Sequence, residues 1–234
     1  MPTFSAPDRT QLAYRINGDG GGDPVVCLPG GPMQDSAYLG DLGGLSGHRR
    51  VVTMDLRGTG RSATPEDTSS YRCDRMVDDV EALREHLGLG RIDLLGHSAG
   101  TNLVVLYAAR YPERVGKLAL IGPSAGAIGI TVTGETRREC ALLRKNEPWF
   151  PAAFAALEAA IANKGTADDF EAIAPFFRGR WDAAARSHHE AASHQINKEA
   201  AGVFGSDGAF DPEAPGRRSP LTRPPSWYWP ESSM

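Results

Sequence analysis

The sequence predicts an α/β protein whose mostly parallel, twisted sheet is flanked by helices on both faces. Up to residue 123, short apolar segments typical of strands alternate with longer segments of helical periodicity. The connections between them are short, and such alternation produces a parallel sheet with right-handed crossovers. Beyond residue 123 the chain becomes rich in Ala and helical in pattern, with almost no β-branched runs.

Five short segments have the pattern of strands. The first alternates apolar and polar residues, as a half-buried strand does, and the others are short apolar runs that end at turn residues or in short connections. In chain order they are TQLAYRI at 10–16, PVVCL at 24–28, RRVVTMDL at 49–56, RIDLLGHS at 91–98 and GKLALIGP at 116–123.

Two segments between these strands have the periodicity of helices. In MVDDVEALREHLGLG the apolar residues recur every three or four positions, which predicts an amphipathic helix that covers the sheet and ends at Gly88. Its apolar face comprises Met76, Val77, Val80, Leu83 and Leu87. A second helix is expected over GTNLVVLYAARYPERV at 100–115.

The change of texture at residue 123 predicts three parts. We expect a core at 1–123, a helical cap at 124–205 and an irregular tail at 206–234 that replaces the final core strands. A helical insertion after the strands of an open α/β sheet is typical of a sub-domain placed over the end of the sheet that binds ligands.

Composition limits the partners. The formal net charge is −4, and Lys and Arg form no cluster, which argues against nucleic acid and against an anionic membrane surface. No segment has the pattern of a signal peptide or approaches about 18 apolar residues, so a cytoplasmic protein is expected. The odd number of cysteines, three, suits reduced thiols, and Cys27 is expected to be a small buried residue.

The strongest chemical signal is GHSAG at 96–100, a G-x-S-x-G motif between an apolar strand and an apolar helix. Small residues on either side of Ser98 let the backbone turn sharply and raise its Oγ above the carboxyl end of the sheet. The N-terminus of the following helix directs N–H groups at the same place. Ser98 is therefore the expected nucleophile, and the alternative is a buried turn serine.

A second signal is LPGGP at 28–32, which follows a buried strand. Gly30 and Gly31 allow the backbone to direct N–H groups into a cavity, and Pro32 stiffens the bend. The N–H groups of Gly31 and Ala99 would together hold the oxyanion of a tetrahedral intermediate. The alternative is an ordinary Gly-Pro turn.

The chain resembles the α/β-hydrolase fold superfamily, because four motifs follow in the family's order over residues 10–125. They are LPGGP, DLRGTGRS at 55–62, GHSAG and AARYPERVGKLALIGP at 108–123. The GGP variant is most similar to the proline iminopeptidase-like branch. In that family the position of Ser98 is the nucleophile, and the positions of Gly31 and Ala99 supply the oxyanion N–H groups.

The chain departs from the branch at two positions. Pro29 stands where a His usually opens the HGGPG motif, and Met33 replaces its last Gly. Iminopeptidases also hold the substrate amine with acidic cap residues, for which Glu147 and Asp182 are candidates, although surface charges on the cap helices are the favoured interpretation.

The DLRGTGRS motif is usually structural in this family. Asp55 and Arg57 are therefore interpreted as a pair that braces the loop rather than as catalytic residues, and catalysis is the alternative.

The remaining members of a catalytic triad are not found by sequence. In this family the order is Ser, then Asp or Glu, then His, and the last two follow the cap. His97 adjoins Ser98 and is expected to line the pocket, while His48 and His86 lie in a loop and at a helix end. The run SHHEAASH, with His188, His189 and His194, is a near miss to the zinc motif H-E-x-x-H and is not expected to bind metal.

The tail has an unusual origin by this interpretation. Read from the third base of each codon, the junctions from Trp227 to Pro230 encode Val, Leu and Ala, the composition of a buried parallel strand. We expect that a frame change between about Ala214 and Arg218 has replaced the strand that carries the catalytic acid. A genuine Pro- and Ser-rich tail is the alternative.

Together these observations predict a serine hydrolase that cleaves an ester or amide bond through an acyl-enzyme on Ser98, with impaired turnover. The expected partner is a small-molecule ester, an amide or a short peptide, and no cofactor or metal is implied. The chain is expected to be a monomer or a homo-oligomer. The alternative is a non-catalytic truncated remnant or a small-ligand-binding module.

Overall fold

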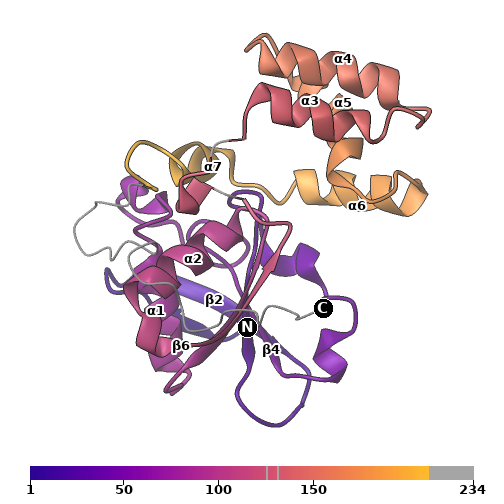
Figure 1. Ribbon diagram of the computed structural model, residues 1–234. Helices are drawn as coiled ribbons and strands as arrows, with labels where there is room; N and C mark the ends of the chain where they lie inside the picture. The colour runs from indigo at the N-terminus through magenta and orange to yellow at the C-terminus, as the bar shows by residue number, and fades with distance from the viewer. Residues whose placement is uncertain (125, 131, 211–234) are drawn as a thin grey trace, which may run out of the picture. The chain divides into compact units, whose positions relative to one another are not determined.

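The computed structural model of this protein describes residues 1–124, 126–130 and 132–210. These residues form two compact units. The first unit holds Met1–Ile130 together with the described residues from Gln195 onward, and the second is Thr131–His194 (Figure 1).

The first unit is built on a mixed sheet. Among the described residues the sheet has six strands in the order β1-β2-β4-β3-β5-β6. The pairs β3–β4, β3–β5 and β5–β6 are parallel, whereas β1–β2 and β2–β4 are antiparallel. The strands are β1 Thr3–Ser5, β2 Gln11–Asn17, β3 Val25–Leu28, β4 Val51–Met54, β5 Ile92–His97 and β6 Val115–Ile121.

All five strands predicted from the sequence are present, as β2 to β6, and the α/β class is confirmed. The extra strand, β1, is only three residues long and has no apolar run of its own. It forms because its backbone pairs with β2 in the register Thr3 opposite Ala13. A strand of this kind depends on its partner and leaves no periodic signal in the sequence.

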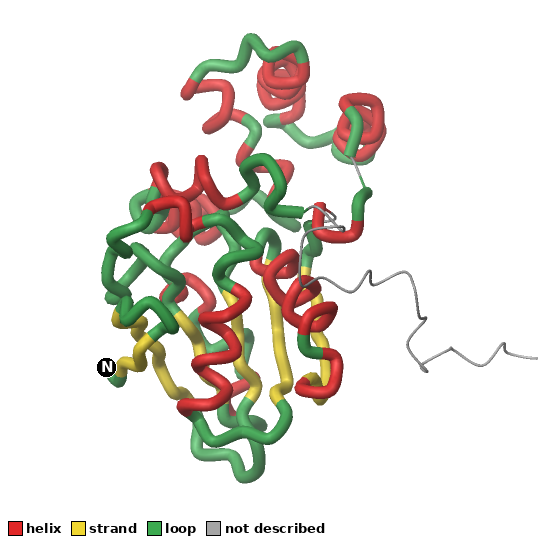
Figure 2. The backbone as a smooth tube through the Cα atoms, turned by 90° about the vertical axis from the view of Figure 1, so that its left-hand side faces the viewer, coloured by secondary structure: helices red, strands yellow, loops and turns green. Residues whose placement is uncertain are grey.

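Alternating residues of the central strands face two different hydrophobic clusters. Val26 and Leu28 belong to the large cluster that includes residues of α1 (Val77–His86) and α2 (Gly100–Arg110), whereas Cys27 points to the opposite face. That second face is covered by η1 (Ser36–Leu39) and η2 (Leu45–Gly47). The two helices expected between the strands, α1 and α2, therefore both contribute to the first face, and in the described chain short 3-10 helices cover the second (Figure 2).

The ends of the core helices follow from single residues. Four apolar residues of the first expected helix are fully buried: Met76, Val77, Val80 and Leu83. Gly88 follows α1 with a φ of +67°, a left-handed conformation that ends the helix. The second helix ends at Arg110 rather than at residue 115, because Pro112 cannot continue an α-helix and begins the 3-10 helix η4, Pro112–Arg114.

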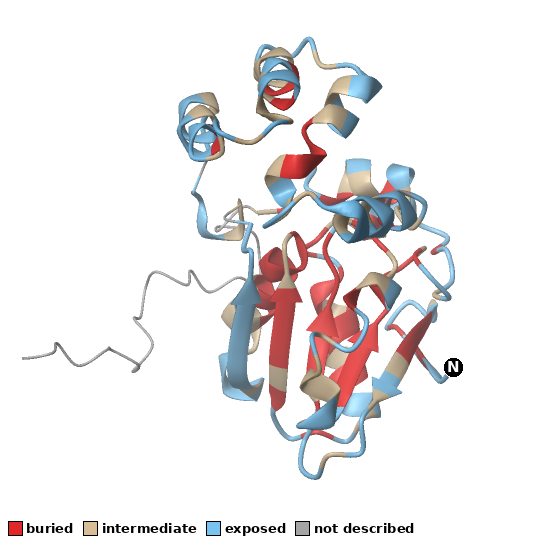
Figure 3. Ribbon diagram, turned by 90° about the vertical axis from the view of Figure 1, so that its right-hand side faces the viewer, coloured by how far each residue is buried: buried red, intermediate tan, exposed pale blue. Residues whose placement is uncertain are grey.

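Strand β6 differs from the other central strands. Leu118, Leu120 and Ile121 are between 38% and 46% exposed, while the neighbouring β5 is largely buried (Figure 3). Within the part of the chain that the structure describes, β6 pairs with β5 alone and forms the edge of the sheet.

The second unit is helical and has its own small core. Thr166 and Asp169 form a capping box that begins α5. Its helices are α3 Gly134–Leu142, α4 Phe150–Ile161, α5 Ala167–Ala172, η6 Ala174–Phe177 and α6 Ala183–Ser193. Its core residues are Ala141, Ala156, Leu157 and Ile173. The helical character predicted for 124–205 is seen here, and the role of this region as a cap stays a prediction.

The chain then returns to the first unit, where α7 (Lys198–Phe204) contributes Ala200 and Phe204 to the large core cluster. The remaining short 3-10 helices of this unit are η3 (Thr68–Tyr71) and η5 (Gly126–Ile128). The predicted loss of the final strands and the predicted frame change concern residues 211–234, which lie outside the described residues. Of the helices that are described, none is both long and apolar enough to cross a membrane.

The cysteines are free thiols. Cys27 and Cys73 are buried and Cys140 is exposed. Burial raises the pKa of the Cys27 thiol to about 12, so it is a protonated packing residue, as its place in the apolar strand predicts.

Candidate active site at the carboxyl end of the sheet

Ser98 lies on a sharp turn between β5, which ends at His97, and α2, which begins at Gly100. Its backbone adopts the left-handed conformation with a φ of +50°, which is uncommon for a residue with a side chain. Such strained residues concentrate at functional sites. Ser98 is half-buried.

The serine turn, residues 96–100, is shaped by close packing. A Cβ atom on Gly100 would lie 2.4 Å from the backbone O of Pro29, and one on Gly96 would lie 2.8 Å from Cα of Thr101. Neither position has room for a side chain. The two glycines of the motif thus occupy the positions where one backbone segment packs directly against another.

The glycine loop, residues 29–36, lies directly against this turn. A Cβ atom on Gly30 would come within 2.8 Å of Cβ of Ser98 and 3.4 Å of the backbone N of Ala99. The next residue, Gly31, has a φ of +116°, which glycine adopts without strain. Among the described residues, neither the N–H of Gly31 nor that of Ala99 has a hydrogen-bond acceptor.

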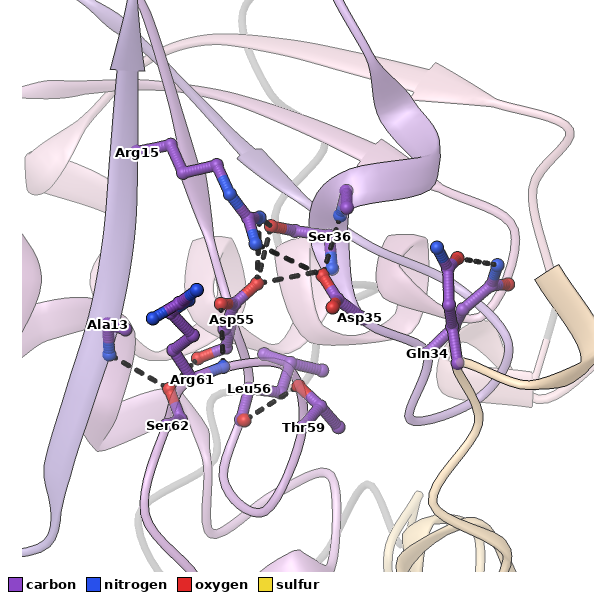
Figure 4. Close-up of polar contacts among 12 residues, drawn as sticks. Ala13, Arg15, Gln34, Asp35, Ser36, Asp55, Leu56, Thr59, Arg61 and Ser62 are labelled. Atoms are coloured by element: carbon purple, nitrogen blue, oxygen red, sulfur yellow. Dashed lines mark hydrogen bonds and ion pairs between the residues drawn. The ribbon is translucent and has the colours of Figure 1, made fainter. Parts of the chain in front are cut away.

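The buried carboxylate of Asp55 fixes the far end of the glycine loop (Figure 4). It accepts hydrogen bonds from the backbone N–H of Ser36 at 3.2 Å and from its hydroxyl at 2.6 Å. Arg15 on β2 lies 3.1 Å away, and the N–H of Arg61 donates at 3.1 Å. A fully buried carboxylate with four donors is a firm anchor, because movement of the glycine loop would remove the two donors on Ser36 and leave the buried group only partly satisfied.

The middle of the glycine loop is joined to the chain where it returns from the second unit. The N–H of Asp35 donates to the O of Gln195 at 3.0 Å, and the N–H of Asn197 donates to the O of Met33 at 3.0 Å. The side chain of Asn197 also donates to the O of Gly58 at 2.9 Å. The two backbone bonds connect the glycine loop to residues 160 and 164 positions later in the chain.

Arg57 braces a different part of the core. Its guanidinium donates two hydrogen bonds of 2.5 Å to the carboxylate of Asp79, which is fully buried, and it also pairs with Asp8. Asp55 and Arg57 therefore both brace loops, but through separate partners and not as a pair with each other. Nothing in these contacts gives either residue a catalytic role.

All six histidines of the chain lie in the described residues. In the first unit, the Nδ1 atom of His97 lies 2.6 Å from the hydroxyl of Tyr38, and the Nε2 atom of His86 lies 3.1 Å from that of Tyr14. His48 follows η2 on the surface. In the described chain, Ser98 Oγ makes no hydrogen bond to any of them.

The acidic and histidine candidates of the second unit have local partners. Glu147 forms an ion pair with Arg144 at 3.1 Å, and Asp182 caps α6 by accepting from the N–H of Ala185 at 2.9 Å. His189, from the run SHHEAASH, lies 2.9 Å from a carboxylate oxygen of Glu171. A search of the described residues finds no group of three or more His, Cys, Asp or Glu that could hold a metal ion.

Comparison with known proteins identifies the family. The model of a family described as "alpha/beta hydrolase fold" matches residues 23–211. This chain belongs to the α/β-hydrolase fold family. The match includes both the glycine loop and the serine turn.

Curated relatives include proline iminopeptidases. The protein from Heyndrickxia coagulans is 35% identical over 113 residues, and that from Saccharolobus solfataricus is 39% identical over 102 residues. These matches cover 48% and 43% of this chain. They span only 39% and 32% of the relatives' own lengths. The resemblance to the proline iminopeptidase-like branch is thereby confirmed for about half of this chain.

Solved structures show the same fold. An enol-lactonase from Burkholderia xenovorans superposes with a TM-score of 0.56 at 24% identity, and covers 93% of this chain and 78% of its own. An esterase from Exiguobacterium antarcticum gives a TM-score of 0.59 at 19% identity, with 86% and 70% covered.

Sequence reasoning located Ser98, Gly31 and Ala99, and the structure brings the serine turn and the glycine loop together. It did not single out Tyr38, whose hydroxyl accepts the N–H of Gly30 at 2.7 Å, nor Ser36 as the partner of Asp55. No local pattern marks these residues, because each acts through a partner distant in sequence.

Proposed function

We propose that this chain is a serine hydrolase of the α/β-hydrolase type, which cleaves an ester or amide bond in a small molecule or short peptide. The observation that carries the proposal is the left-handed backbone of Ser98 on a strand-to-helix turn. That conformation is costly for a serine, and it exposes the side chain at the end of the sheet where open α/β folds bind ligands.

In the proposed reaction, Oγ of Ser98 attacks the carbonyl carbon of the substrate and its proton passes to a base. The carbonyl oxygen becomes an oxyanion, which the N–H groups of Gly31 and Ala99 would stabilise. Both groups are available, since no described residue accepts from them. Collapse of the intermediate breaks the ester or amide bond, the leaving group takes up the proton, and water later releases the acyl group from Ser98.

Two observations bear on the proposed substrate class: the names of the curated relatives, and the contacts of the two acidic residues that could hold a peptide amine. The curated relatives named proline iminopeptidase favour an amide at the end of a short peptide. Glu147 and Asp182 already have partners within the second unit, so the peptide amine gains no support from them. We therefore retain both esters and amides as substrates.

We further propose that turnover is impaired. The proton of Ser98 needs a base, and among the described residues no histidine is hydrogen-bonded to it. Loss of the base costs serine hydrolases several orders of magnitude in rate, on the order of a thousandfold or more. The same observation favours the second candidate, a non-catalytic module that binds a small ligand in the same pocket.

A fluorophosphonate probe separates the two candidates. We expect the probe to label wild-type protein and the Ser124→Ala variant but not Ser98→Ala, with the modified peptide identified by mass spectrometry. Ser124 is the matched control, because it is exposed and its backbone N–H lies 3.4 Å from the O of Ser98. A folded wild-type sample that is not labelled at Ser98 would favour the binding module.

Turnover is measured separately with p-nitrophenyl esters and proline anilides. We expect release to be slow compared with the median enzyme, whose kcat is about 10 per second. A kcat near that median would contradict impairment and would require a base from elsewhere in the molecule.

A further inference from the structure

We infer that Tyr38 and His97 are positioning residues that hold the glycine loop in place beside Ser98. The inference rests on the proposed function, since it assigns these side chains a task for the oxyanion N–H groups. The hydroxyl of Tyr38 lies 2.7 Å from the backbone N of Gly30 and 2.6 Å from Nδ1 of His97. One oxygen atom thus joins the glycine loop to the residue that precedes the nucleophile.

The position of Gly30 makes this bond consequential. Gly30 is buried, lies against Cβ of Ser98 and is bonded directly to Gly31, the proposed oxyanion donor. Its own N–H has to find an acceptor, because a buried N–H without a partner destabilises the fold. Tyr38 supplies that acceptor and thereby fixes the peptide that precedes the N–H of Gly31.

The bond from Gly30 has one direction, because a backbone N–H only donates. In the inferred arrangement the phenolic proton is donated to Nδ1 of His97, which carries its own ring proton on Nε2. A side chain with an acceptor at the position of Nδ1 would preserve the arrangement, and one without it would not.

Tyr38 is itself firmly placed. It lies on η1, whose first residue, Ser36, is bonded to the buried Asp55. Its ring packs against the cluster formed by Cys27, Leu39, Val51 and Leu95 on the second face of the sheet. The hydroxyl therefore reaches Gly30 from a rigid support, which is what a positioning residue requires.

The test uses Tyr38→Phe, His97→Leu and His97→Asn. Tyr38→Phe keeps the ring and removes the oxygen, His97→Leu removes the acceptor, and Asn offers its Oδ1 in place of Nδ1. Tyr14→Phe is the matched control, because Tyr14 makes the same kind of bond to His86 elsewhere in the first unit.

The first readout is amide hydrogen exchange at Gly30, measured by NMR. Tyr38→Phe and His97→Leu should speed exchange by about tenfold, the effect of one hydrogen bond, while Tyr14→Phe and His97→Asn should leave it near the wild-type rate. The N–H of Val26, a fully buried residue of β3, serves as the internal reference for an intact fold. Unchanged protection of Gly30 in Tyr38→Phe would overturn the inference even if Ser98 proves unreactive.

The second readout is the rate of fluorophosphonate labelling at Ser98. It should fall about tenfold in Tyr38→Phe and in His97→Leu, and no further in the double variant, because His97 reaches Gly30 only through the hydroxyl of Tyr38. Rescue by His97→Asn would distinguish positioning from packing. Normal labelling of Tyr38→Phe would overturn the inference and leave the proposed function intact, whereas faster exchange with no labelling of wild type would reject only the function.

Discussion

The serine turn and the glycine loop lie side by side, yet they are held by different forces. The serine turn is fixed by contact between backbones, since Gly96 and Gly100 have no space for a Cβ atom. The glycine loop is fixed by hydrogen bonds that it donates to the buried Asp55 and to Tyr38, and by backbone hydrogen bonds with residues 195–197. One half of the candidate site depends on shape and the other on polar partners.

The difference has a mechanical meaning. Close packing has a steep repulsive limit, so a single added methyl group disturbs the serine turn. A hydrogen bond is worth only about 1 kcal/mol net, so the glycine loop depends on the sum of several. Three substitutions, in order of decreasing effect, test whether the two halves respond as this contrast predicts.

The largest effect is expected from Gly100→Ala. The new Cβ atom would lie 2.4 Å from the O of Pro29 and 2.7 Å from that of Leu28, and both are backbone atoms that cannot rotate away. We expect the free energy of unfolding in urea to fall by about 3 kcal/mol, the upper range for overpacking. Gly90→Ala, with no atom within 4 Å of its Cβ position, should change it by less than about 0.5 kcal/mol. Equal effects would show that the serine turn is not set by packing.

Asp55→Asn should follow. The variant keeps one acceptor but turns an NH2 group toward donors, so the four hydrogen bonds at this fully buried carboxylate cannot all be kept. We expect a loss of about 2 kcal/mol in unfolding free energy, from a buried donor left without a partner. Labelling of Ser98 should slow as well. Asp19→Asn, at an exposed position, serves as the control and should leave both measurements unchanged.

The smallest effect is expected from Asn197→Ala. The substitution removes the cap on α7, where Oδ1 accepts from the N–H of Ala200 at 3.1 Å, and the bond to the O of Gly58. The bond from the N–H of residue 197 to the O of Met33 remains, because it belongs to the backbone. Thermal unfolding should report a loss of about 1 kcal/mol, and Lys198→Ala none. A loss of stability as large as that of Gly100→Ala would contradict the claim that the glycine loop depends on several weak hydrogen bonds.

The same contrast explains how much the sequence predicted. The serine turn is local in sequence, so the G-x-S-x-G motif with a strand before it and a helix after it predicted the sharp turn at Ser98, whose role as nucleophile stays a prediction. The five strands and the helix over residues 77–86 were predicted because their periodicity is also local.

The glycine loop was only half predicted. Gly30 and Gly31 were visible as a motif, but the partners that hold the loop are 8 to 164 residues away in sequence, from Tyr38 on Gly30 to Asn197 on Met33. The sequence around Tyr38 or Gln195 contains no motif that predicts its hydrogen bonds, because these bonds form only when the chain has folded. The short strand β1 escaped prediction for the same reason, since it depends on β2.

The left-handed backbone of Ser98 has one more consequence, which concerns selection rather than chemistry. Glycine would occupy a φ of +50° without the strain of about 1 kcal/mol or more that a serine carries there. A lineage selected for robustness alone would gain by exchanging Ser98 for glycine. The difference in unfolding free energy between Ser98→Gly and Ser98→Ala therefore measures how much stability this chain loses by keeping a residue with a side chain at that position.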